Sequence, residues 1–523
     1  MLGVLAVAAF VRLRLVNLPL ERDEGGFAYT AQRMLRGVPP YREAYDMRLP
    51  GTYLAYAAFM AVGGETTAAI HLGLLLVNAA TIVLIFVLAR RLFDPLCAVA
   101  AAGAYAILSL GSGVLGLAAH TTHFVALPVV AACILLARRP EPRSAATLGL
   151  IGLLMGIAFA TKQHAVFFGL FGGVWLCARE WQSRPRSARR SAWRISAYSL
   201  GCMLPFALVC AAAWRIGVFE RFWFWTFTYA SEYASESSVG EGVEVLRILL
   251  PGVIGPATLL WLLAAVGIVA VAVRPEMRDA RAFTLGLLFA SLLAVLPGFK
   301  FRGHYFIALL PALALLVGAA IGALRDALSR SGVSGRIATA GAGALLLAAL
   351  VHPLWVERIA FFRLPPERVS RAWYGMNPFA ESLPIADYLR AHTSADSRIA
   401  VIGSEPEIYF YAKRRAATGY LYMYGLTEAQ PFALDMQQDL IRELEAAKPE
   451  YLVMVNVDMS WTRHPGSPTA LFDWYSLYVQ RYYETVGVVD LVEPLRSEYR
   501  WDDAARAYQV RSHDFVAVLR RRD

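Results

Sequence analysis

The sequence predicts an all-α polytopic membrane domain followed by a small extracytoplasmic α/β domain. Hydrophobic residues make up 57% of the 523 residues and charged residues 17%, and the mean hydropathy is +0.47. Soluble globular proteins do not need that balance. Apolar runs long enough to cross a bilayer recur along residues 1–360. Residues 361–523 are more polar and alternate strand-like with helix-like patterns, which is typical of an α/β domain.

The apolar runs give about eleven expected transmembrane helices on the length criterion. They are residues 1–18, 66–89, 95–113, 121–137, 144–161, 164–178, 195–214, 249–273, 281–297, 304–324 and 336–352. The first run carries Arg12 and Arg14 near its end and lacks a small-residue cleavage site. We therefore expect it to be a retained anchor rather than a signal peptide.

Arginine is concentrated in every second loop between these runs, in Arg90–Arg91 and in residues 138–143, 179–194, 274–281 and 325–336. The positive-inside rule places such loops in the cytoplasm, so the intervening loops and the tail are expected outside. The richness in Arg and Ala indicates a bacterial plasma membrane protein. The arginine-rich loops account for much of the net charge of +10, so nucleic acid is not an expected partner.

The tail contains two short apolar runs, at residues 398–403 and 450–457, that suit buried strands. An amphipathic helix is expected between them, at residues 436–448, with Leu440, Ile441 and Leu444 on its apolar face. Strands that alternate with helices indicate an α/β domain.

Two adjacent acids, Asp23 and Glu24, stand in the expected outer loop 19–65. The residues after them place Phe27 and Met34 on one helical face and Arg33 on the other, which predicts an amphipathic helix along the membrane surface. Asp23 would serve either as the N-cap of this helix or as a functional carboxylate. Capping needs one acid, and the sequence offers two.

Histidines and cations stand at the outer ends of three other runs. His120 and His123 are three residues apart and are expected to share a helix face; they suit the lining of a cavity better than a metal pair that lacks a third ligand. The other groups are Lys162 with His164 and the cluster Arg302, His304 and Tyr305, beside Lys300. Snorkelling at the interface is one explanation for the cations, and an anion site, such as one for phosphate, is the other.

The loop at residues 218–237 is dense in Trp, Phe and Tyr. It suits either an aromatic belt at the membrane interface or a platform for a sugar or a lipid. Together, an acidic pair and cations around an outward cavity suit transfer from a lipid-linked phosphate donor. The alternative is a transporter or flippase of lipid-linked or small anionic substrates, but no inverted repeat of hydropathy is evident.

The order of motifs resembles that of the polyprenyl-phosphate-sugar-dependent glycosyltransferases of the GT-C fold. The stretches "DEGGFAYTAQRMLRGVPPY" (23–41) and "LPGTYLAY" (49–56) carry the resemblance, with the Lys162 segment, "RGHYFIALLPALALL" (302–316) and the α/β tail. The similarity is to the bacterial protein-mannosyltransferase and aminoarabinose-transferase superfamily, glycosyltransferase family 39-like, and covers nearly the whole chain.

The resemblance implies an inverting transfer from a polyprenyl-phosphate sugar to an acceptor hydroxyl on a lipid, a protein or a polysaccharide. It assigns the catalytic base to Asp23, with Glu24 beside it. The leaving lipid phosphate needs cations, for which Arg48, Lys162, Arg302 and His304 with Tyr305 are the candidates. His120, His123 and His164 would line the substrate cavity.

Two positions depart from the family pattern. Many relatives carry a Lys before the proline of the first loop, where this chain has Arg48-Leu49-Pro50. Many relatives also carry an acid near the position of His123, where this chain has His120 and His123 instead. Because the chain lacks this acid as a metal ligand, we expect no metal, and we expect no other cofactor.

Overall fold

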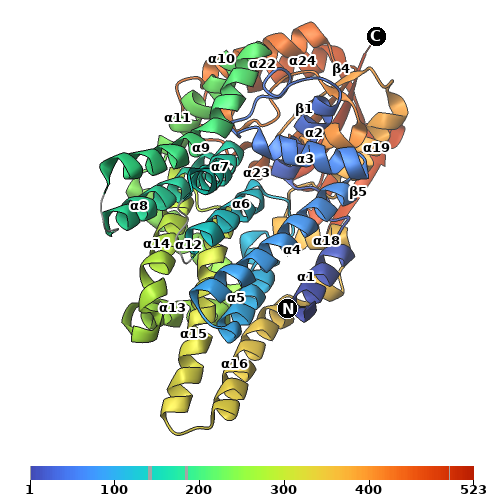
Figure 1. Ribbon diagram of the computed structural model, residues 1–523. Coiled ribbons are helices and arrows are strands. Elements are labelled where there is room, and N and C mark those ends of the chain that lie inside the picture. The colour runs from blue at the N-terminus through green and yellow to red at the C-terminus, as the bar shows by residue number, and fades with distance from the viewer. Residues whose placement is uncertain (1, 139–143, 183–186, 494, 523) are drawn as a thin grey trace.

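The computed structural model describes residues 2–138, 144–182, 187–493 and 495–522. A bundle of helices forms its lower part, and the C-terminal domain covers one end of the bundle (Figure 1). The bundle helices are α1 (Leu2–Arg14), α4 (Thr67–Leu92), α5 (Pro95–Leu108), α6 (Thr121–Leu136), α7 (Ala145–Thr161), α8 (Val166–Gln182), α9 (Ala188–Arg215), α12 (Val239–Ile254), α13 (Thr258–Val273), α14 (Arg278–Val295), α15 (Leu310–Arg330) and α16 (Gly335–Val356).

Each expected span overlaps one of these helices, but length alone does not establish eleven crossings. Among the described residues, five helical stretches are long and apolar enough to cross a membrane. They are Thr67–Leu92, Ala188–Arg215, Val239–Val273, Gly303–Arg330 and Gly335–Val356. Within the helical stretch Val239–Val273, the expected span 249–273 is not one continuous α-helix, because a 3-10 turn at Gly255–Ala257, with Pro256 inside it, joins α12 to α13.

The turn between α15 and α16 lies at the end of the molecule opposite the C-terminal domain (Figure 1). This turn belongs to the arginine-rich loop 325–336. Two other arginine-rich loops include residues 139–143 and 183–186, which lie outside the described residues. The side of the membrane on which each loop lies stays a prediction.

The expected outer loop 19–65 forms two helices, α2 (Arg22–Leu35) and α3 (Gly51–Gly63). The predicted amphipathic helix is present as α2, but its polar face is not exposed as that of a surface helix would be. Whether α2 lies along the membrane stays a prediction. Both of its faces are covered: Phe27 and Ala31 are buried, and so are Thr30 and Arg33 on the polar face. The helix packs between α3 and the C-terminal helix α20 (Glu407–Ala412).

The C-terminal domain contains a six-stranded sheet in the order β2-β1-β3-β6-β4-β5. The strands are β1 (Arg398–Ile402), β2 (Arg415–Ala416), β3 (Tyr451–Asn456), β4 (Tyr483–Glu493), β5 (Arg496–Trp501) and β6 (Phe515–Arg521). β1 pairs in parallel with β2 and β3, and the remaining pairs are antiparallel. The two predicted strands, now β1 and β3, and the predicted helix, now α22 (Ala433–Ala447), are confirmed.

Shorter helices join these strands to one another and to the bundle. They are α17 (Arg358–Phe362), α18 (Pro366–Tyr374), α19 (Ser382–His392), α21 (Tyr424–Thr427), α23 (Asp458–Trp461), α24 (Ala470–Tyr482) and α25 (Asp503–Arg506). Between α9 and α12 the chain forms α10 (Phe219–Trp223), a π-helix (Phe224–Tyr229) and α11 (Ala230–Ser235).

The two largest hydrophobic clusters lie in different parts of the described structure, and the site lies where these parts meet. One cluster contains the buried faces of the bundle helices. The other joins α2 and α3 to the C-terminal sheet, so that Phe27 and Tyr53 belong to the same core as Ile399 and Val453. The first loop and the C-terminal domain are therefore packed as one unit on the end of the bundle.

Candidate active site

A cavity of about 900 Å³ lies where the bundle meets the unit formed by α2, α3 and the C-terminal domain. Its ionisable lining includes Asp23, Arg48, Lys162, Arg302 and His304. These residues come from three distant parts of the chain, as the sequence predicted. A volume of this size is typical of a pocket for a small organic ligand.

The first turn of α2 shows that Asp23 is not the helix cap. Glu21 is the N-cap: its side chain accepts a hydrogen bond of 3.0 Å from the backbone N–H of Glu24. Glu24 completes a capping box by accepting 3.3 Å from the backbone N–H of Glu21. Burial, with the nearby charges of Asp23 and Glu24, raises the pKa of Glu21 well above its usual range.

Asp23 points into the cavity and is held by Arg48. Its Oδ1 accepts a 2.7 Å hydrogen bond from Arg48 Nη2, and its Oδ2 lies 3.9 Å from His304 Nε2. Burial by itself raises the pKa of Asp23, but the charges of Arg48, His120 and Lys162 outweigh it, and the pKa lies below its ordinary value. Asp23 is therefore an ionised carboxylate, which can accept a proton.

Glu24 turns away from the cavity, although the sequence predicted it beside the base. It is fully buried, and its Oε1 accepts hydrogen bonds from His71 Nε2 at 3.0 Å and from the backbone N–H of Ala119 at 2.6 Å. It is not among the cavity-lining residues. Its contacts tie the start of α2 to α4 and to the segment before α6, which fixes the position of its neighbour Asp23.

Two of the predicted cations, Lys162 and Arg302, line the cavity from the bundle side. Lys162 Nζ donates to Thr122 Oγ1 at 3.2 Å and lies 4.2 Å from the centroid of the Tyr305 ring. Among the described residues, neither Lys162 nor Arg302 forms an ion pair with a carboxylate. Burial and the nearby Arg48 lower the pKa of Lys162 to about 7, against the opposing effect of Asp23. Two cations without a carboxylate partner favour an anionic ligand.

The three histidines assigned to the cavity do not all reach it. His120 and His164 line it, and the His120 ring stacks on that of His304 with centroids 4.2 Å apart. His123 is buried elsewhere, and neither of its ring nitrogens has a hydrogen-bond partner among the described residues. The prediction of a shared helix face was wrong because His120 precedes α6 in an extended conformation, with φ −60° and ψ 143°.

One oxygen or nitrogen from each of Asp23, His120 and His304 lies within 4.8 Å of the others, so these three side chains could hold a metal ion. They offer the nitrogen and oxygen ligands that zinc accepts. However, Asp23 already pairs with Arg48 at this point, so a cation would compete with the guanidinium.

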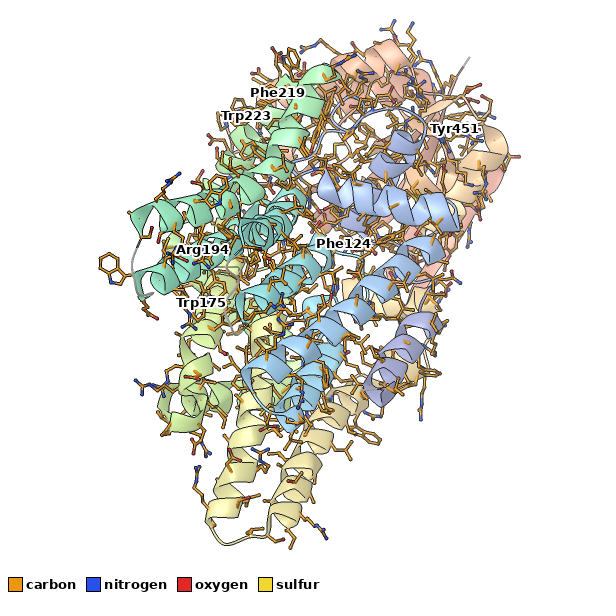
Figure 2. All side chains as sticks on the ribbon, in the orientation of Figure 1. Phe124, Trp175, Arg194, Phe219, Trp223 and Tyr451 are labelled. Atoms are coloured by element: carbon orange, nitrogen blue, oxygen red, sulfur yellow. The ribbon has the colours of Figure 1, made fainter. Side chains whose placement is uncertain are left out.

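The aromatic loop 218–237 divides between two environments. Trp225 and Tyr229, on the π-helix, line the cavity, and Trp225 stacks on Tyr45 with centroids 5.7 Å apart. Phe219 and Trp223 lie together on α10 at the margin of the molecule (Figure 2). The loop therefore supplies both a cavity wall and an outer apolar surface.

The C-terminal domain supplies cavity residues that the sequence reasoning missed. Tyr420, Tyr422 and Tyr424 all line the cavity, and Arg48 lies between the rings of Phe27 and Tyr422, 5.5 Å from each centroid. The alternation of tyrosine in "GYLYMYG" (419–425) was the available signal. Arg22 was also missed, although it precedes Asp23 directly.

Comparison with solved structures identifies the fold. The protein is similar to ArnT from Cupriavidus metallidurans bound to undecaprenyl phosphate, with a TM-score of 0.58 and 16% identity. The match covers 99% of this chain and 97% of the ArnT chain. The chain has the GT-C fold. A second GT-C match is the Archaeoglobus fulgidus oligosaccharyltransferase tethered with an acceptor peptide, at a TM-score of 0.53 and 13% identity, covering 96% of this chain and 74% of that one.

Sequence comparison agrees with the GT-C assignment over part of the chain. Residues 48–209 match the family model described as dolichyl-phosphate-mannose-protein mannosyltransferase. No curated protein matches the chain. Because the ArnT match covers nearly all of both chains, the GT-C likeness includes the C-terminal domain as well as the bundle.

Proposed function

We propose that this protein is an integral-membrane inverting glycosyltransferase. It moves a sugar from a polyprenyl-phosphate donor to an acceptor hydroxyl on the extracytoplasmic face of a bacterial plasma membrane. The acceptor is a lipid, a protein or a polysaccharide.

One observation carries the proposal: a carboxylate and two cations without carboxylate partners face the same cavity. Asp23 is ionised and oriented by Arg48 at 2.7 Å. Lys162 and Arg302 line the same cavity. A transfer from a sugar phosphate needs both features, a base for the attacking hydroxyl and positive charge for the leaving phosphate.

The proposed chemistry uses these positions as follows. The acceptor oxygen attacks the anomeric carbon while Asp23 takes its proton. The bond from the anomeric carbon to the phosphate oxygen breaks, and its electron pair stays on the lipid phosphate. Lys162, Arg302 and Arg48 stabilise the charge that develops there. A single displacement inverts the anomeric centre. Arg48 has a second role, because its charge keeps the Asp23 carboxylate deprotonated. The same charge makes this carboxylate a weaker base.

The named relatives support this class of substrate. The ArnT structure is bound to undecaprenyl phosphate, and an archaeal oligosaccharyltransferase structure of the same fold is in complex with a dolichol phosphate. The matching family model, over residues 48–209, begins at Arg48 and includes Lys162.

The test is incubation of the purified full-length protein with a panel of undecaprenyl-phosphate sugars and with acceptors of the three classes. Mass spectrometry of the lipid and product fractions should show free undecaprenyl phosphate and a glycosylated acceptor in equal amounts. Donor that crosses a vesicle membrane unaltered, with no released phosphate, would instead favour a flippase.

A further inference from the structure

Arg22, the residue before Asp23, is held almost entirely by the C-terminal domain. Its Nε donates 2.6 Å to the backbone carbonyl of Ser404, and its Nη2 donates 2.8 Å to Glu405 Oε1 and 2.9 Å to Asn377 Oδ1. Its guanidinium also lies 5.4 Å from the centroid of the Phe379 ring. These partners are about 355 to 383 residues away in sequence, so the C-terminal domain determines the position of this side chain.

The partners of Arg22 are themselves fixed within the C-terminal domain. Glu405 is fully buried, and its second oxygen accepts 2.7 Å from Ser460 Oγ. Ser404 Oγ donates to the carbonyl of Ser460 at 2.6 Å and accepts from the backbone N–H of Met423 at 2.8 Å. Met423 stands between the two cavity tyrosines Tyr422 and Tyr424. The same network therefore sets both Arg22 and one wall of the cavity.

Two glycines, Gly25 and Gly26, allow α2 to pack closely against the C-terminal domain. A Cβ on Gly25 would lie 2.5 Å from the backbone nitrogen and 2.8 Å from the Cα of Glu407, and a Cβ on Gly26 would lie 1.8 Å from Tyr422 Oη. Backbone atoms cannot rotate away as a side-chain end can. Only glycine at position 25 allows α20 to lie directly against the first turns of α2.

We propose that the C-terminal domain positions the reactive carboxylate. Its contacts with Arg22 and Gly25 set the angle at which α2 presents Asp23 to the cavity. Glu405, which does not line the cavity, is a positioning residue that acts through Arg22. This inference rests on the proposed function, because the effect is expected in the transfer step. A base displaced by about 1 Å can lose about two orders of magnitude in rate.

Two variants of the full-length protein test the proposal. Glu405→Gln removes the charge that holds Arg22 without changing the cavity lining, and Gly25→Ala pushes α20 away without changing any charge. The matched control is Gly343→Ala, also within a helix, where an added Cβ meets nothing within 4 Å. Turnover is measured per mole of folded protein, and undecaprenyl-phosphate binding is measured separately.

We expect both variants to lower kcat at least about tenfold, with KM for the donor within about threefold of wild type, while Gly343→Ala retains wild-type kcat. Because turnover is counted per mole of folded protein, a loss of folded protein cannot imitate the fall in kcat. An unchanged KM shows that donor binding is retained, as expected for a displaced base. Wild-type kcat in both variants would overturn the proposal.

Amide hydrogen exchange tests the contact between α2 and the C-terminal domain independently of whether the protein transfers sugar. If the wild-type protein transfers no sugar in any combination, the proposed function has failed. In that case the backbone amides of residues 23–27 decide whether the C-terminal domain holds α2. Faster exchange of these amides in Glu405→Gln than in Gly343→Ala would support the contact, and equal exchange would overturn it.

Discussion

Arg48 binds two carboxylates with one guanidinium: Nη2 donates to Asp23 Oδ1 at 2.7 Å and Nη1 donates to Asp46 Oδ1 at 2.8 Å. Asp46 is fixed in turn by Tyr53, whose hydroxyl donates to its other oxygen at 2.8 Å. The orientation of Asp23 thus depends on a chain of contacts that starts in α3. The ion pair also sets the protonation state of Asp23, which makes Arg48 the first residue to test.

Replacement of Arg48 by Gln should move the acid limb of the pH–rate profile to higher pH. Burial alone raises the pKa of Asp23, and Arg48 is the largest of the charges that lower it. Without Arg48, the pKa of Asp23 should rise, so the carboxylate should stay protonated up to a higher pH. His120, His304, Lys162 and Arg22 still face Asp23 and moderate the shift. An acid limb at the wild-type position would contradict the assigned role of Arg48.

Donor affinity should weaken as pH rises through about 7, where buried Lys162 loses its proton. Lys162→Arg should remove this dependence, because a guanidinium remains charged. Lys162→Ala should raise KM for the donor about tenfold or more at pH 6.5 or so. The matched control is Lys413→Arg, at an exposed position in the C-terminal domain. Unchanged donor kinetics in Lys162→Ala would remove Lys162 from the phosphate site.

Transfer should persist after treatment with EDTA. Asp23, His120 and His304 lie close enough to hold a metal ion, but the ion pair with Arg48 already neutralises Asp23. The measurement is turnover before and after chelation, with the metal content of the protein determined in parallel. Loss of activity that Zn²⁺ or Mn²⁺ restores would show that the three side chains bind a required metal.

The hydropathy pattern was enough to place the bundle helices, because an apolar run of membrane length has few alternatives to a helix. It could not show that α2 is buried on both faces. An amphipathic helix has the same residue pattern whether its polar face is exposed to water or packed against a domain that comes much later in the chain. The arginine on that face, Arg33, is buried and pairs with Glu43 at 3.2 Å. The half-buried Glu43 pairs in turn with Arg415 of the C-terminal domain at 2.6 Å.

The sequence predicted the candidate site where a charged residue stood at the end of an apolar run, because a charge near the membrane is energetically costly and has few explanations. Lys162 and Arg302 stood out for this reason, and both line the cavity. The roles of Glu21, Asp23 and Glu24 were not separable in the sequence, since any of the three can cap a helix. Their separation depends on backbone geometry that places Glu21 at the cap. Arg22 and Tyr422 were missed because their partners are distant in sequence.

The turnover of Asp23→Asn tests the central claim most directly. Asn keeps the size of the side chain and accepts a hydrogen bond from Arg48, but it cannot take a proton from the acceptor. With saturating donor and acceptor, released undecaprenyl phosphate is counted over time for wild type and variant. We predict a rate at least about 100-fold lower in Asp23→Asn, with carrier-lipid binding retained. A variant that turns over at the wild-type rate would contradict the assignment of Asp23 as the base.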